Sequence, residues 1–191
     1  MGAYSTESKN AALMAIADAL ESMKPRIDAA NAEDVAAAKA NGVSPAMIDR
    51  LTLTESRFRS MVDGVRHVAT LPDPVGELIW ERDRPSGIHI RKVRQPFGVI
   101  AVVFESRPNV FVDTAALCIK TSNAVILRGG KEAFRSNQAL NAAVRTGLEK
   151  SGLPIDVVQM VETTDHAGVT ALVRSVGLID VAIPRGGERL I

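Results

Sequence analysis

Three short segments of the sequence combine glycines, cations or an amide in patterns suited to an anionic ligand. They are Glu105-Ser106-Arg107-Pro108-Asn109, Arg128-Gly129-Gly130-Lys131 and Arg185-Gly186-Gly187. Glycines let a backbone come close to a ligand, and arginine and lysine side chains suit phosphate groups. Each segment follows a run of apolar residues, so its chemistry depends on whether that run is a strand and where the strand ends.

Asn109 allows two interpretations. Pro108 disfavours helix at Arg107, which puts Asn109 at or just before the start of a helix. Asparagine is a good N-terminal helix cap, and the spacing alone favours this role. The alternative is that its side-chain amide donates a hydrogen bond to a developing oxyanion.

The segment at 128–131 also allows two interpretations. It can be a glycine-rich turn with solvated side chains, or a phosphate site in which Arg128 and Lys131 add to the partial positive charge of the next helix N-terminus. A position at a strand end favours phosphate. The turn at 185–187 repeats the order of strand, glycines and helix start, although it does not match the GxGxxG fingerprint.

The first third of the chain should be helical. Residues 5 to about 70 show apolar residues at helical spacing, with N-cap candidates at Ser5 or Thr6, Ser44 and Thr54 and a stop at Asn41-Gly42. Residues 76–95 predict a highly charged β-hairpin with its turn at Pro85-Ser86-Gly87. A two-stranded ribbon is marginal alone, so we expect it to pack on a neighbouring sheet or subunit.

From Phe97 onward, buried strands should alternate with helices. The expected strands are nearly continuous apolar runs, at 98–104, 123–127, 157–161 and 179–183, and the helices lie at 109–121, 132–150 and 165–176. This alternation predicts an α/β fold with a Rossmann-like parallel sheet and right-handed crossovers, which binds ligands at the carboxyl ends of its strands. We divide the chain into a helical segment at 1–75, a hairpin at 76–95 and an α/β core at 96–191.

Composition excludes several classes of protein. The net charge is +1 and 24% of residues are charged, so nothing in the bulk charge favours nucleic acid or an anionic membrane as partner. No apolar run approaches the roughly 20 residues of a membrane span, and no targeting signal is visible, so we expect a cytoplasmic protein. His67, His89 and His166 lack partners at metal-ligand spacing, so we expect no metal.

Cys118 is the single cysteine, which rules out an internal disulfide. It lies between Leu117 and Ile119 in a predicted helix, and Lys120, two positions away, faces elsewhere. A reactive thiol needs a helix N-terminus or a cationic neighbour. We therefore expect Cys118 to be buried and inert.

The block RQPFGVIAVVFESRPNVFVDTAALCIKTSNAVILRGGKEA closely resembles the γ-glutamyl phosphate reductase (glutamate-5-semialdehyde dehydrogenase) family of the aldehyde dehydrogenase superfamily. IDVAIPRGG and the leader NAEDVAAAKANG are similar to the same family, so the resemblance covers essentially the whole chain. It implies NADPH-dependent reduction of γ-glutamyl phosphate to glutamate semialdehyde in proline biosynthesis. It also implies oligomerisation through the hairpin, and it makes glutamate 5-kinase a candidate partner.

The resemblance assigns roles to the three segments. Asn109 matches the asparagine that holds the oxyanion. Arg128, Gly129, Gly130 and Lys131 match the ribose and 2′-phosphate end of the cofactor, and Arg185, Gly186 and Gly187 match the turn near its pyrophosphate. NAD-using relatives place an acidic residue where gapless matching puts Lys131, so a lysine there favours NADP.

The nucleophilic cysteine of the family belongs to a later segment, and Cys118 is not its counterpart. A sequence that stops at the start of a crossover helix also looks truncated. We therefore expect these 191 residues alone to be inactive. Two hypotheses remain: the chain is part of a reductase, or it is a non-catalytic module that binds nucleotide or pairs with a longer subunit.

Overall fold

A computed structural model describes residues 4–187, apart from the side chain of His166. The strands are β1 (Leu78–Asp83), β2 (His89–Val93), β3 (Val99–Phe104), β4 (Ala124–Arg128), β5 (Val158–Met160) and β6 (Val181–Arg185). The α-helices are α1 (Thr6–Ser22), α2 (Lys24–Ala40), α3 (Pro45–Leu51), α4 (Glu55–Thr70), α5 (Pro108–Lys120), α6 (Phe134–Ser151) and α7 (His166–Arg174). The 3-10 helices are η1 (Lys131–Ala133) and η2 (Ile155–Val157).

The expected caps set the boundaries of the first helices. The side chains of Ser5, Ser44 and Thr54 each accept a hydrogen bond from a backbone N–H in the first turn of α1, α3 and α4. Helix α2 ends before Asn41, and Gly42 follows with φ +68°, a conformation that glycine adopts without strain. The prediction of helices before residue 70 is confirmed.

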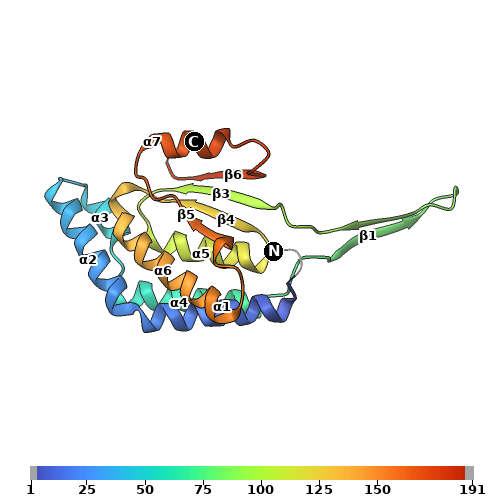
Figure 1. Ribbon diagram of the computed structural model, residues 1–191, viewed down its shortest axis with the longest axis horizontal. Helices are drawn as coiled ribbons and strands as arrows, with labels where there is room; N and C mark the ends of the chain where they lie inside the picture. Colours follow the sequence, from blue (N-terminus) through green and yellow to red (C-terminus); the bar gives the residue numbers. More distant parts are fainter. Residues whose placement is uncertain (1–3, 188–191) are drawn as a thin grey trace.

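The Rossmann-like sheet is confirmed. Its order is β5-β4-β3-β6 and all neighbours are parallel. Helices α5 and α6 cover one face, α7 covers part of the other, and α1 and α4 form an outer layer against α5 and α6 (Figure 1). Alternate residues of β3 divide between the faces: Ile100 and Val102 join the large core beneath α5 and α6, whereas Ala101 and Val103 face Val169 and Leu172 of α7.

The last strand lies two residues further along the chain than the sequence predicts. Ile179 forms an isolated bridge with Val176 and Asp180 precedes the strand, whereas β6 runs to Arg185 because its register pairs Phe104 with Arg185 at the end of β3. Pro184 is tolerated within β6 because, among residues 4–187, this strand is at the edge of the sheet. Arg185 therefore ends a strand, and the prediction that it belongs to the turn is wrong.

The hairpin of β1 and β2 is antiparallel, as predicted, and it projects away from the rest of the molecule (Figure 1). Every residue of its strands is exposed except the half-buried Ile90. The hairpin forms a sheet of its own, apart from the four-stranded sheet, so of the two expected contacts the one with a neighbouring subunit stays a prediction. Its base is held by Asp73, which accepts hydrogen bonds from Thr6 and the Val75 backbone and pairs with the buried Lys9 at 2.5 Å.

No helix among residues 4–187 is long and apolar enough to cross a membrane. The same residues contain no group of three or more His, Cys, Asp or Glu side chains that would hold a metal ion.

Two helical glycines should respond in opposite ways to alanine. A Cβ added at Gly147 of α6 would lie 2.5 Å from the Ile16 Cα of α1, whereas one at Gly64 of α4 meets nothing within 4 Å. We expect Gly147→Ala to lower the free energy of unfolding by about 1–3 kcal/mol through overpacking. Gly64→Ala should raise it by about 0.5–1 kcal/mol through helix propensity. Denaturant unfolding measures both, and equal effects would contradict the close packing of α1 on α6.

Candidate functional site

The carboxyl ends of β3 and β6 meet at one edge of the sheet, where the chain order of the strands reverses direction. Such a switch point is the usual ligand-binding place of an open parallel sheet. A groove of about 310 Å³ lies there, which we call the arginine groove. Its lining residues are Arg50, Phe104, Glu105, Arg107, Val110, Arg185, Gly186 and Gly187.

The arginine groove contains one anion held by a backbone donor. Gly187 N–H donates to Glu105 Oε1 at 2.8 Å, which ties the end of β6 to the end of β3. Among residues 4–187, the guanidinium groups of Arg50 and Arg107 take part in no hydrogen bond or ion pair. The groove therefore combines a backbone N–H that already binds a carboxylate with the side chains of Arg50 and Arg107, which are available to an anion.

Asn109 lies beside this groove in the first turn of α5. The N-cap of α5 is Arg107, without a side-chain cap hydrogen bond, so the interpretation of Asn109 as a helix cap is wrong. Its Nδ2 instead donates to Asp113 Oδ2, one helical turn later, at 3.0 Å. An amide nitrogen carries two N–H groups, and within residues 4–187 the second one has no acceptor, so it is available to an oxyanion.

Asp113 is a site residue that the sequence analysis missed. Burial raises the pKa of its carboxyl group, while the hydrogen bond from Asn109 and the charge of Arg185 act in the opposite direction. The spacing of Asn109 and Asp113, four residues apart on a helix, is the signal that would have indicated their contact.

Arg128 and Lys131 are separated by the fold. Arg128 is buried, and its Nη2 donates to the Thr164 carbonyl at 2.8 Å, which fixes the loop between β5 and α7. Lys131 is exposed at the start of η1, and its ammonium group makes no hydrogen bond or ion pair with other described residues. Of the two cations, Lys131 is thus the one placed to meet a ligand.

Lys131 lines a second recess, of about 770 Å³, between the end of α2 and the start of α6. The other lining residues are Asp34, Ala37, Ala38, Asn41, Val43, Glu132, Phe134, Arg135, Gln138 and Thr164. The lining of this recess shares no residue with the lining of the arginine groove. Lys131 and the turn at Arg185, Gly186 and Gly187, which the resemblance matches to the two ends of the cofactor, therefore line separate depressions.

Gly129 and Gly130 are required by packing within the chain. A Cβ on Gly129 would lie 2.2 Å from Asn137 Nδ2, and a Cβ on Gly130 would lie 2.3 Å from Ser106 Oγ. Two glycines at a strand end predict a close approach of the backbone to a ligand. The structure fills the space on their Cβ side with the protein's own side chains, so their identity alone does not indicate a ligand.

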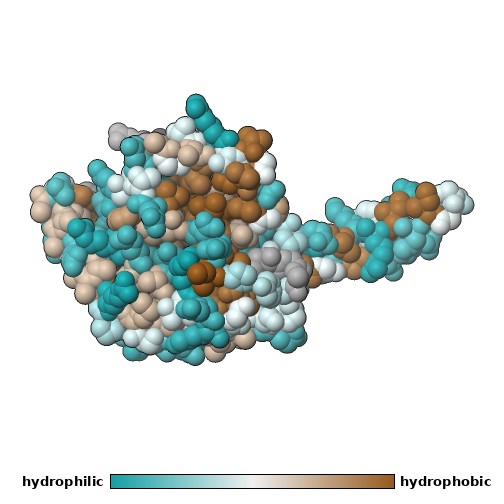
Figure 2. Space-filling view, in the orientation of Figure 1, coloured by the Kyte–Doolittle hydropathy of each residue, from teal (hydrophilic) through white to brown (hydrophobic). Residues whose placement is uncertain are grey.

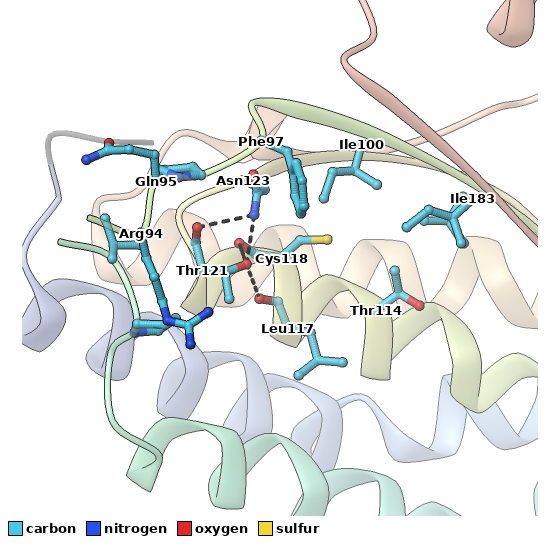
Figure 3. A pocket seen from close by; sticks show the side chains of 14 residues that line it. Arg94, Gln95, Phe97, Ile100, Thr114, Leu117, Cys118, Thr121, Asn123 and Ile183 are labelled. Atoms are coloured by element: carbon cyan, nitrogen blue, oxygen red, sulfur yellow. Dashed lines mark hydrogen bonds between the residues drawn. The ribbon is translucent and has the colours of Figure 1, made fainter. Parts of the chain in front are cut away.

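An apolar groove of about 520 Å³ lies towards the amino-terminal ends of β3 and β4, near the hairpin base. Figure 3 shows Phe97, Ile100, Cys118 and Thr114 lining it. Figure 2 shows a separate gathering of hydrophobic side chains over the strands below α7. Cys118 is buried, and burial raises the pKa of its thiol to about 11. The expectation of a buried thiol is confirmed, and the raised pKa disfavours the thiolate there.

No protein-family model matches this chain. A γ-glutamyl phosphate reductase from Thermotoga maritima shares 38% identity and a TM-score of 0.95, covering 98% of this chain and 45% of that one. A γ-glutamyl phosphate reductase from Saccharomyces cerevisiae shares 35% identity and a TM-score of 0.91, covering 98% and 48%.

A more distant structure shows the fold alone. A probable aldehyde dehydrogenase from Listeria monocytogenes has 14% identity and a TM-score of 0.72, covering 100% of this chain and 39% of that one. The chain thus spans slightly less than half the length of the two γ-glutamyl phosphate reductases that it matches.

Proposed function

Because the chain belongs to the γ-glutamyl phosphate reductase family, we propose that it forms part of an enzyme that reduces γ-glutamyl 5-phosphate with NADPH. The products are glutamate 5-semialdehyde and phosphate, as a step of proline biosynthesis. In this reaction a thiolate, which Cys118 does not provide, would displace phosphate from the acyl group, and a bound nicotinamide cofactor would supply the hydride that reduces the thioester before the aldehyde and the thiolate separate. The chain's own residues bind the cofactor and stabilise the oxyanion.

The observation that carries the proposal is the arrangement at the end of β3. The Asn109 amide, with one N–H free, lies next to a groove that already holds a carboxylate on the Gly187 N–H. A backbone donor that binds a carboxylate also suits a phosphate oxygen. If Gly186 and Gly187 receive the cofactor's pyrophosphate, Glu105 must give way, and Arg107 and Arg185 supply the compensating positive charge.

NADP fits the second recess through Lys131. This exposed cation has no partner among the described residues, so a 2′-phosphate would give it one. Arg128 contributes by fixing the Thr164 loop beside the same recess. The nicotinamide cofactor supplies the hydride, and these residues bind and orient it.

The exposed hairpin fits a role in assembly. Leu78, Ile79, Trp80, Ile88 and Val93 are each more than a third exposed, although they are apolar. Exposed apolar side chains on a projecting ribbon are typical of a contact surface. We propose homo-oligomerisation through the hairpin, in a cytoplasmic enzyme for which glutamate 5-kinase remains a candidate partner.

The proposal is tested on full-length enzyme in the reverse direction, with glutamate semialdehyde, phosphate and NADP⁺. We expect NADPH formation, and we expect Cys118→Ala to retain it because a buried thiol of pKa about 11 is not the nucleophile. The isolated 191-residue chain should bind NADPH without turnover. Activity that disappears in Cys118→Ala, with the fold preserved, would make Cys118 the nucleophile and contradict this account.

A further inference from the structure

A third depression, of about 310 Å³, opens directly beside Asn109, and we call it the polar recess. It is formed by the segment joining α3 to α4, the first turns of α4 and the start of α5. Its lining residues are Arg50, Thr52, Leu53, Ser56, Arg57, Ser60, Met61, Asn109 and Asp113. Hydroxyl, amide, carboxylate and guanidinium groups thus surround one small space.

The charged groups of the polar recess are incompletely paired. The Asp113 carboxylate accepts one hydrogen bond, from Asn109, and forms no salt bridge within residues 4–187. The Arg50 guanidinium has no hydrogen bond or ion pair there either, and the hydroxyls of Ser56 and Ser60 have no hydrogen-bond partner in the part of the chain described. Arg57, by contrast, is committed to Asp49 and to the Thr52 carbonyl.

We propose that the polar recess binds the α-amino acid end of the substrate. The Asp113 carboxylate accepts hydrogen bonds from the substrate's ammonium group, and Arg50 donates to its α-carboxylate. The acyl end of the same molecule then points towards Asn109, which forms part of the wall of the recess. This assignment rests on the proposed function for its choice of a glutamyl group.

The lack of a salt bridge at Asp113 among the described residues supports a cationic ligand. Burial raises the pKa of this carboxyl group, because taking a carboxylate out of water is unfavourable, and the hydrogen bond from Asn109 and the charge of Arg185 offset only part of that cost. An ammonium group supplies that cation. A phosphate group would meet the Asp113 carboxylate as a like charge, so it fits the arginine groove better than the polar recess.

Three small ligands separate the two contacts. L-glutamate has both groups, glutarate lacks the ammonium, and 4-aminobutyrate lacks the α-carboxylate. Titration of the purified protein, followed by ¹H–¹⁵N NMR, should show L-glutamate binding about 10- to 100-fold more tightly than either of the others, since each loses one charge-assisted hydrogen-bonded pair.

Two variants assign each contact to its residue. Asp113→Asn should reduce L-glutamate affinity to that of glutarate and leave glutarate binding unchanged. Arg50→Gln should reduce L-glutamate affinity to that of 4-aminobutyrate. Asp63→Asn is the matched control, because this exposed carboxylate belongs to α4 but lies outside the recess. The NMR spectra themselves report whether each variant is folded, and Arg50 lies on a different helix from Asp113.

Several outcomes would overturn the inference. They are equal binding of the three ligands, no binding of L-glutamate, and unchanged discrimination in both variants. NADPH titrated into the same samples keeps this test apart from the proposed function. If the protein discriminates between the three small ligands but does not bind NADPH, the polar recess is supported and the reductase function is contradicted. If it binds NADPH but does not discriminate, the reductase function is supported and the polar recess is contradicted.

Discussion

In full-length enzyme, Asn109→Ala should lower kcat by about 10²–10³-fold, the usual loss when one oxyanion donor is removed. The amide occupies the first turn of α5, where Asp113 holds one N–H and so fixes the direction of the other. The substitution removes both interactions but leaves the backbone of the helix intact. Steady-state kinetics with saturating substrate and NADPH measure the loss.

The control for Asn109→Ala is thermal unfolding. Since Asn109 does not cap α5, the melting temperature should fall by far less than a lost cap would cause. Asn109→Asp should be at least as inactive as the alanine variant, because a carboxylate has no N–H and repels a developing oxyanion. Normal kcat in either variant would remove Asn109 from the chemistry.

Lys131→Glu should weaken the binding of NADPH by about 2 kcal/mol, or roughly 30-fold in affinity, and leave the binding of NADH almost unchanged. The side chain is exposed and without a partner among the described residues, so its replacement breaks no existing contact. A glutamate there would place a negative charge against the 2′-phosphate, which NADH lacks. Fluorescence titration of each cofactor gives the two affinities.

Lys150→Glu provides the charge-matched comparison for Lys131→Glu. This exposed lysine lies at the other end of α6, so the same change in net charge should leave both cofactors unaffected. Lys131→Arg should keep the preference for NADPH. Equal weakening of NADPH and NADH by Lys131→Glu would count against the assignment of the 2′-phosphate to this residue.

The sequence predicts the elements of the fold well because their signals are local. The apolar runs that become β3 and β4, the caps at Ser44 and Thr54 and the stop at Asn41-Gly42 each depend on a few neighbouring residues. Local signals do not predict the end of β6, because it is set by pairing with β3, which is distant in sequence.

The site was predicted only in part, for the same reason. The motif around Asn109 reaches the right edge of the sheet, but its partner Asp113 and the neighbouring Arg50 depend on how α3 and α5 pack. Arg128 and Lys131 are equally cationic in sequence. Arg128 lies at the end of β4 and is buried against Thr164, whereas Lys131 begins a 3-10 helix and is exposed. The composition of the segment does not predict this difference.

Within residues 4–187, β6 is attached to the sheet through β3 alone, and four of its five residues are exposed. An element held this weakly opens locally at a lower free-energy cost than β3 or β4. Each opening would separate Gly187 from Glu105 and carry Arg185 away from Arg107, so the arginine groove would vanish while the helices stayed folded. A ligand that bridges the two strand ends binds only the form in which β6 is paired with β3, and it stabilises that form. Hydrogen exchange in β6 and ligand affinity at this edge are therefore two measurements of one equilibrium.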